Sequence, residues 1–160
     1  MTVSFILNRV QVSVDTPAGT RLADLLREQC ELPGCRAGCY AGECGACTIY
    51  YNGELAYSCL IPAFAAQNAE IITLEGLAGT QELRDIEKGL QEAAYTPCIN
   101  CRQSKILTIH ALLESNPVPE KTEIDSALNG HSCGCTDMRT LHSVINACVT
   151  FRRTRRNAGR

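Results

Sequence analysis

The sequence predicts an α+β chain with a strand-rich first half and a helical second half. Short segments in which apolar and polar residues alternate recur up to residue 74, whereas apolar residues recur every three or four positions after residue 80. Hydrophobic residues make up 45% of the 160 residues and charged residues 20%, a balance typical of globular proteins. The two patterns meet near 75–79, so we expect two domains, 1–76 and 77–160.

The first half is expected to contain five strands, one helix and a long loop. Residues 3–7 and 10–14 alternate on either side of a short turn and predict a hairpin. Thr20 is the candidate N-cap of the helix, and Asn52-Gly53 is a strong hairpin signal between two further strands. The remaining assignments are strands 48–51, 54–59 and 70–74, the helical face Leu22, Leu25 and Leu26, the loop 33–47, and hairpin packing by Tyr50, Tyr51 and Tyr57.

The second half is expected to form a four-helix bundle. Asn116-Pro117 ends the second helix, and Asn129-Gly130 ends a short third helix over 122–128. His110 lies among apolar residues and is expected to be a satisfied core or boundary histidine rather than a metal ligand. The apolar positions at helical spacing are Leu83, Ile86, Leu90 and Ala93, then Ile106, Leu107 and Leu113, and finally Met138, Leu141, Val144, Ile145 and Cys148.

Composition and charge limit the range of functions that the sequence supports. A net charge of -2 gives no electrostatic reason to expect a nucleic-acid partner, and no apolar stretch approaches the length of a membrane span. Arg9 and Asp15 interrupt the region where a secretory signal would be apolar, so we expect a cytoplasmic protein. Eleven cysteines in such a chain indicate metal binding rather than disulfides.

The first candidate metal site is a loop with three cysteines and a fourth cysteine downstream. Cys39-x4-Cys44-x2-Cys47 followed by Cys59 is the plant-type 2Fe–2S spacing. A four-cysteine zinc site is the alternative, although zinc sites usually supply two separate short cysteine pairs. Cys35-x3-Cys39 offers a second register for the same loop.

Glycines in this loop are expected to shape it around the metal centre. Gly38, Gly42 and Gly45 are the candidate cofactor-binding residues, because glycine tolerates positive φ and lets backbone N–H groups approach sulfur closely. Their spacing favours the register that begins at Cys39. Cys30 is then expected to be a small buried residue and Cys35 a loop thiol.

A second candidate site is formed by two cysteine pairs far apart in the sequence. Cys98-x2-Cys101 precedes the second predicted helix of the bundle, and Cys133-x-Cys135 precedes the last. Helix N-termini favour anions, so two of them would stabilise a negatively charged cluster. Zinc is again the alternative on spacing alone.

The two groups together resemble the small iron–sulfur subunit of the xanthine dehydrogenase and aldehyde oxidoreductase family of molybdenum hydroxylases. The stretch GCYAGECGACTIYYNGELAYSC, residues 38–59, is similar to the family's first cluster motif almost position for position. CINC and CGCT lie where the family has its second motif, and the resemblance covers nearly the whole chain. It implies a ferredoxin-like β-grasp domain followed by a four-helix 2Fe–2S domain.

The resemblance also implies a function for each site. Cys39, Cys44, Cys47 and Cys59 would bind the outer cluster, which faces flavin. Cys98, Cys101, Cys133 and Cys135 would bind the inner cluster, near molybdopterin. Electrons from substrate hydroxylation would pass from molybdenum through both 2Fe–2S clusters to FAD. The chain would then be a non-catalytic electron-transfer subunit. Its partners in a hetero-oligomer would be the large subunit, which binds molybdopterin, and the medium subunit, which binds FAD.

The chain departs from the family around the second site. Family members typically read Gln-Cys-Gly-Phe-Cys-Thr-Pro-Gly where this chain reads PCINCRQS, residues 97–104. Pro97 has no side-chain amide to contact the pterin, and Ile99 adds bulk where the family has glycine. The family's Cys-Arg-Cys-Thr-Gly-Tyr appears as CGCTDM, residues 133–138. We therefore expect any unusual partner or cofactor contact at Pro97, Ile99, Asn100 and residues 102–104.

Two other functions stay open on the sequence. One is a free-standing two-cluster electron carrier, and the other is a zinc-stabilised interaction module without redox chemistry. The basic end of the chain, residues 151–160, is either a solvated tail or a docking strip for an acidic partner surface.

Overall fold

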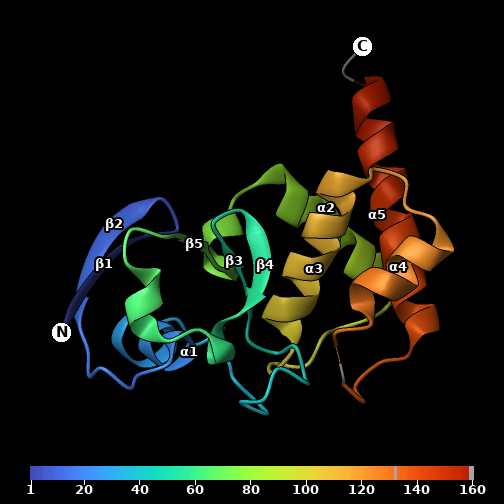
Figure 1. Cartoon of the computed structure of the whole chain (residues 1–160). Helices are drawn as coiled ribbons and strands as arrows, with labels where there is room; N and C mark the ends of the chain where they lie inside the picture. Colours follow the sequence, from blue (N-terminus) through green and yellow to red (C-terminus); the bar gives the residue numbers. More distant parts are fainter. Residues whose placement is uncertain (132, 159–160) are drawn as a thin grey trace.

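The computed structural model describes residues 1–131 and 133–158, with a sheet at one side and the longer helices at the other (Figure 1). The sheet has five strands in the order β2-β1-β5-β3-β4. Strands β1 and β5 run parallel, and the other neighbours are antiparallel. The strands are β1 Thr2–Leu7, β2 Val10–Asp15, β3 Thr48–Tyr51, β4 Glu54–Tyr57 and β5 Glu70–Ile72.

Both predicted hairpins are confirmed. Asn8 and Arg9 connect β1 to β2 with φ of 51° and 71°, and Asn52 and Gly53 connect β3 to β4 with φ of 50° and 88°. Two consecutive positive φ values are what a type I′ hairpin turn requires. Alternate residues of β1 are buried, so this strand presents one face to the core.

The helix predicted after residue 20 exists, but its expected cap is wrong. Helix α1, Leu22–Asp24, has Arg21 as its N-cap, without a side-chain capping bond, and it continues as the π-helical segment η1, Leu25–Gln29. Thr20 cannot serve as the cap, because its carbonyl accepts the N–H of Ala63 in a short pairing beside Arg21. Tertiary pairing therefore moves the start of the helix by one residue.

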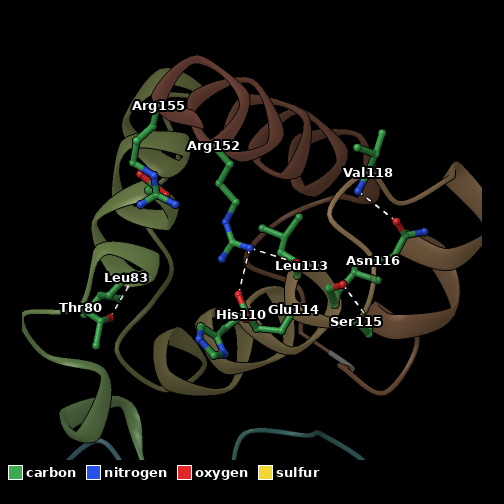
Figure 2. Close-up of polar contacts among 12 residues, drawn as sticks. Thr80, Leu83, His110, Leu113, Glu114, Ser115, Asn116, Val118, Arg152 and Arg155 are labelled. Carbon is green, nitrogen blue, oxygen red and sulfur yellow. Dashed lines mark hydrogen bonds and ion pairs between the residues drawn. The ribbon is translucent and has the colours of Figure 1, made fainter. Parts of the chain in front are cut away.

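The predicted helical second half is confirmed as four helices. They are α2 Gln81–Glu92, α3 Arg102–Ser115, α4 Lys121–Leu128 and α5 Met138–Ala158. Thr80 caps α2 by accepting the N–H of Leu83 at 3.2 Å (Figure 2), and Glu120 with Glu123 forms a capping box at α4. Within the described residues, no helix combines the length and apolar character needed to cross a membrane.

Each half of the chain has its own hydrophobic core. Leu22, Leu25 and Leu26 are fully buried against the sheet, as predicted. In the second half, α2 and α5 approach closely at Gly89, where a Cβ atom would overlap the Cys148 sulfur. The core between the helices contains Ile86, Leu90, Ile106, Ile109, Leu112, Leu113, Ile124, Leu128, Leu141, Val144, Ile145, Cys148 and Val149.

The basic end of the chain is not wholly a solvated tail. Helix α5 continues to residue 158, beyond the other helices in Figure 1. Arg152 is only 7% exposed, and its Nη1 donates to the Leu113 carbonyl and to Glu114 Oε1, both at 3.0 Å (Figure 2). Arg155 pairs with the buried Asp85 of α2 at 3.0 Å. These arginines therefore hold α5 against α2 and α3. Residues 159–160 of the basic end lie outside the described part of the chain.

Side chains of the hairpin β3–β4 join the two halves. Tyr50 Oη lies 2.8 Å from His110 Nδ1 on α3, so His110 is a satisfied boundary histidine, as predicted. Tyr57 Oη donates to the Gly130 carbonyl at 3.3 Å. Two of the three hairpin tyrosines therefore also make polar contacts across the two halves.

Candidate metal centres

The second cysteine group converges in space. The sulfur atoms of Cys98, Cys101, Cys133 and Cys135 all lie within 4.8 Å of one another. The closest pairs are Cys133 with Cys135 at 3.0 Å and Cys98 with Cys101 at 3.1 Å. Among the residues that the structure describes, no other set of three or more histidine, cysteine or acidic side chains converges as tightly.

Backbone geometry places both pairs at helix starts, as the sequence predicted. Cys101 is the N-cap of α3, and the N–H groups of Cys101 and Arg102 both bond to the Cys98 carbonyl, which curls the pair into one turn. Cys135 lies three residues before Met138, where α5 begins. The N-terminal end of α3, which carries partial positive charge, therefore lies at the site.

Hydrogen bonding favours ionisation at the exposed edge of this group. Burial opposes ionisation of Cys135, but bonds from Tyr95 and from the neighbouring cysteines outweigh it and lower the pKa of this thiol to about 5. Burial raises the pKa of Cys101, which lies deeper. A thiolate is the form that binds metal, so Cys135 is already biased toward the ligating form.

A lysine contacts the second site from inside the protein. Lys105 is 1% exposed, and its Nζ donates to Tyr95 Oη at 2.9 Å and to Cys135 Sγ at 3.2 Å. The sequence reasoning missed both residues. The available signal was the four-residue spacing from Cys101 to Lys105, which places both side chains on one face of α3.

The first cysteine group lies in the loop between η1 and β3, with its fourth member after β4. Cys39 Sγ accepts backbone N–H groups from Ala41, Glu43 and Cys44 at 3.3–3.4 Å. These bonds, the one from Ala41 most, lower the pKa of the Cys39 thiol to about 6. The loop therefore directs N–H groups at a sulfur, as its glycine pattern indicated.

The four cysteines of this group form two pairs rather than one tight set. The side chain of Cys44 affects the pKa of Cys39, and the side chain of Cys59 affects that of Cys47. Cys47 and Cys59 are buried, and burial raises the pKa of Cys47 to about 12. A binuclear cluster held by four thiolates has two ligands for each iron, so a paired arrangement is compatible with it.

The loop glycines have the conformations that the sequence reasoning required. Gly42 and Gly45 have φ of 77° and 69°. Gly38 has no positive φ but packs closely, since a Cβ there would lie 3.1 Å from Cys44 Sγ. Outside the loop, Arg21 Nη1 donates to the carbonyls of Tyr40 at 2.9 Å and Cys59 at 3.3 Å, which ties the fourth cysteine to the loop.

The loops that carry the two cysteine groups touch each other. A Cβ atom on Gly45 would collide with the Gly130 carbonyl and would lie 2.9 Å from His131 Nδ1. The other nitrogen of His131, Nε2, is 2.7 Å from Thr108 Oγ1 on α3. Gly45 lies between Cys44 and Cys47, and His131 lies two residues before Cys133, so backbone from both sites is packed together.

The unusual residues around Cys98 and Cys101 divide into two sets. Gln103 and Ser104 face the interior, where Gln103 Nε2 donates to the Thr48 carbonyl at 3.2 Å and to Cys35 Sγ at 3.3 Å. Ile99 is 71% exposed, and Asn100 is also exposed. Exposed Arg102 belongs to this outward set too, whereas Pro97 is buried. The expectation of partner contacts therefore does not hold for Gln103 and Ser104 within this chain's own fold, because both side chains serve its packing.

A pocket lies beside the first cysteine pair of the second site. Its volume is about 540 Å³, and Arg102 pairs with Glu87 across 3.3 Å at its wall. The pocket is lined by Glu87, Leu90, Gln91, Ala94, Tyr95, Thr96, Pro97 and Arg102.

The expectations for two cysteines outside the sites hold only in part. Cys35 is fully buried and belongs to the first core, whereas Cys30 is only half-buried. The cause is Gln103, which reaches from α3 and covers the Cys35 sulfur. Cys35 is therefore a packed interior residue, and Cys30 is the more exposed thiol.

The donor chemistry suits an iron–sulfur protein. Both sites offer four cysteine sulfurs, which is the ligand set of a 2Fe–2S cluster and also of structural zinc. The family model described as a 2Fe-2S iron-sulfur cluster binding domain matches residues 5–71, and that described as a 2Fe-2S binding domain matches residues 73–146. The fold and the sites therefore define a protein with two 2Fe–2S binding domains.

Known proteins of this class match almost the whole chain. The nicotinate dehydrogenase small FeS subunit of Eubacterium barkeri is 38% identical over 93% of this chain and 95% of its own. A nicotinate dehydrogenase chain of Pseudomonas putida is 34% identical over 95% of this chain and 98% of its own. The chain belongs to the small iron–sulfur subunits of the molybdenum hydroxylase family, whose role is electron transfer.

Solved structures agree with this assignment. A chain of quinoline 2-oxidoreductase from Pseudomonas putida 86 superposes with a TM-score of 0.87 at 30% identity, over 96% of both chains. The aldehyde oxidoreductase of Desulfovibrio desulfuricans superposes with a TM-score of 0.85 at 25% identity, over 96% of this chain and 17% of that longer one. The same fold thus occurs as a separate chain and as part of a larger one.

Proposed function

We propose that this chain conducts electrons from a molybdopterin-binding subunit through two 2Fe–2S clusters to an FAD-binding subunit. The observation that carries the proposal is the packing of the two cysteine loops against each other at Gly45, Gly130 and His131. Contact between the two loops lets electrons pass from one site to the other through the protein. A 2Fe–2S cluster bound at each site supplies one-electron oxidation and reduction.

The ligands follow from the two cysteine groups. Cys39, Cys44, Cys47 and Cys59 would hold the first cluster, and Cys98, Cys101, Cys133 and Cys135 the second. Around the first site, N–H groups that point at Cys39 stabilise negative charge on sulfur. Around the second site, the start of α3 at Cys101 has the same effect. The glycines Gly38, Gly42 and Gly45 act by letting the first loop close around its cluster.

The outward residues beside Cys98 are proposed to face the molybdopterin subunit. Ile99 is an isolated exposed apolar side chain, and Arg102 borders the pocket of about 540 Å³ next to Pro97. Pro97 is buried and offers no side-chain amide to a pterin, so we propose that groups of the partner subunit replace the contact that glutamine makes in the family. We propose a cytoplasmic hetero-oligomer in which domains 1–76 and 77–160 face the flavin and molybdopterin subunits, respectively.

Metal analysis with cysteine variants tests ligation. The wild-type chain should contain about four iron and four acid-labile sulfide ions, and two distinct paramagnetic signals should appear on reduction. Cys44→Ser should remove one signal and Cys101→Ser the other, each with about half of the iron. Cys30→Ser is the matched control, because this half-buried thiol lies outside both groups, and it should keep both signals. A colourless chain with stoichiometric zinc would overturn the proposal.

Purification from the native host tests the partners. Co-elution with one chain that carries molybdenum and another that carries flavin is the expected result. A monomer that contains both clusters but neither partner would instead support a free-standing electron carrier. Within the purified complex, loss of electron transfer to FAD in Cys44→Ser, with molybdenum still reduced by substrate, would place the first site between the two cofactors.

A further inference from the structure

A buried lysine contacts a cysteine of the second site. The chain has three lysines, and Lys105 is buried whereas Lys88 and Lys121 are exposed. Lys105 Nζ donates to Cys135 Sγ at 3.2 Å and to Tyr95 Oη at 2.9 Å. The ammonium group also lies 5.4 Å from the centre of the Tyr95 ring. Its position is therefore defined by three contacts rather than by the usual freedom of a surface lysine.

The charge of Lys105 needs a negative partner at this place. A buried ammonium group is unfavourable unless it is paired. None of the ion pairs found in residues 1–131 and 133–158 includes Lys105. The only acceptors that the described structure gives Nζ are the tyrosine hydroxyl and the cysteine sulfur. The negative charge that pairs with Lys105 is then the charge of the four thiolates and of the cluster they hold.

We propose that Lys105 raises the reduction potential of the cluster bound by Cys98, Cys101, Cys133 and Cys135. Reduction adds one electron to the cluster, and no bond forms or breaks in the protein while Lys105 keeps its proton. The reduced form carries one more negative charge, so the N–H···S bond from a cation to Cys135 stabilises it more than the oxidised form. The inference rests on the proposed function, because it requires that this group hold a redox-active cluster.

The position of Lys105 makes the effect specific to one site. Lys105 lies one helical turn after Cys101 on α3, so the helix that supplies a ligand also directs the charge at that site. The contacts found for Nζ involve Cys135 and Tyr95, and none involves a cysteine of the first group. The first cluster therefore serves as an internal reference in the same molecule.

Redox titration of the full chain, in the complex in which it is purified, tests the proposal. The two reduced clusters are followed by electron paramagnetic resonance in wild type, Lys105→Met, Lys105→Gln and Lys105→Arg. Lys88→Met is the matched control, because Lys88 is exposed on α2. Both neutral variants should lower the equilibrium constant for reduction of the second cluster about tenfold, which is about 59 mV for a one-electron couple. Lys105→Arg, Lys88→Met and the first cluster should show less than a twofold change.

The possible results distinguish a failure of the Lys105 proposal from a failure of the proposed electron-transfer function. Absence of a second cluster in the wild-type chain would refute the proposed function. Two clusters in every variant, with the potential of the second unchanged, would refute the role of Lys105 alone. Loss of the second signal in both neutral variants, with iron in the first site retained, would also overturn the role, because Lys105 would then be an assembly residue.

Discussion

Gln103 of α3 donates a hydrogen bond from Nε2 to the backbone carbonyl of Thr48 in β3, at 3.2 Å. The same nitrogen lies 3.3 Å from the buried sulfur of Cys35, so one side chain bonds to two elements of the first half. Gln103 follows Cys101 by two residues. The helix that begins at the second metal site is thereby held against the sheet that carries the first.

Replacing Gln103 should loosen the contact between the two halves. Gln103→Leu removes both hydrogen bonds in a buried place, and each is worth about 0.5–1.5 kcal/mol. We expect the free energy of unfolding to fall by about 1–3 kcal/mol, measured from the thermal midpoint of the cluster-loaded chain by calorimetry. Gln91→Leu, at an exposed site on α2, is the control and should change stability by less than about 0.5 kcal/mol. Equal midpoints for the two variants would contradict this role.

Gly45→Ala should damage the contact between the two cysteine loops. Its φ of 69° disfavours a side chain, and the added Cβ would overlap the Gly130 carbonyl. We expect a loss of about 1–3 kcal/mol of stability from backbone strain, together with a weakened paramagnetic signal of the first cluster. Gly134→Ala in the other cysteine loop is the matched control, since its Cβ would meet nothing within 4 Å. If both variants behave alike, the loop contact has no energetic importance.

Arg152 should matter for stability, although it belongs to the basic end of the chain. Arg152→Ala removes a buried guanidinium group from the Leu113 carbonyl and from Glu114 (Figure 2). Hydrogen bonds of charged groups contribute about 1.5–3 kcal/mol, and we expect a loss of this size in thermal unfolding. The exposed neighbour Arg153→Ala should lie within about 0.5 kcal/mol of wild type. A stable Arg152→Ala chain that no longer binds its partner would instead favour a docking role.

Acid should destabilise the chain partly through His110. Burial lowers the pKa of His110 below its ordinary 6.5. The charge of Arg152 lowers this pKa further, whereas the charges of Glu114 and Glu82 raise it. The ring also contacts Tyr50 Oη. The unfolded chain therefore takes up a proton at higher pH than the folded one. Stability should fall as pH drops from 7 through 6.5 and should level off below the folded pKa.

The contribution of His110 can be isolated with His110→Gln, which keeps a polar group beside Tyr50. The thermal midpoints of both proteins are compared at pH 7 and pH 5. The decrease on acidification should be smaller in the variant, because glutamine does not titrate and the rest of the chain is the same in both proteins. A decrease of the same size in both proteins would show that other groups account for the acid sensitivity.

Local patterns predicted much of the fold. The hairpins at Asn8-Arg9 and Asn52-Gly53 were predictable because these pairs adopt the positive φ values of tight turns. The end of α3 before Pro117 and the helical face of α5 followed from equally local rules. The cap at Thr20 was wrong, because a backbone pairing with Ala63 uses the Thr20 carbonyl, and that partner is 43 residues away in the sequence.

For the candidate sites, too, local features were predictable from the sequence and contacts between distant residues were not. Spacing indicated both candidate groups, and the glycine pattern of the first loop favoured Cys39 over Cys35 as its first member, because these features are visible in short windows of the sequence. Spacing did not indicate that Lys105 contacts Cys135, since the two are 30 residues apart. It also did not indicate that Cys35 is covered by Gln103, 68 residues away.

By itself, the sequence predicted the two candidate cysteine groups, the position of most strands and helices, and the family to which the chain belongs. Those features depend on windows of a few residues, in which periodicity, turn chemistry and cysteine spacing act directly. Only the tertiary structure decided that the two cysteine loops touch at Gly45, that a cation stands beside Cys135, and that Gln103 joins the two halves. Each of these contacts joins residues 30 or more apart, and such pairs are brought together only when both hydrophobic cores form and α3 packs on β3.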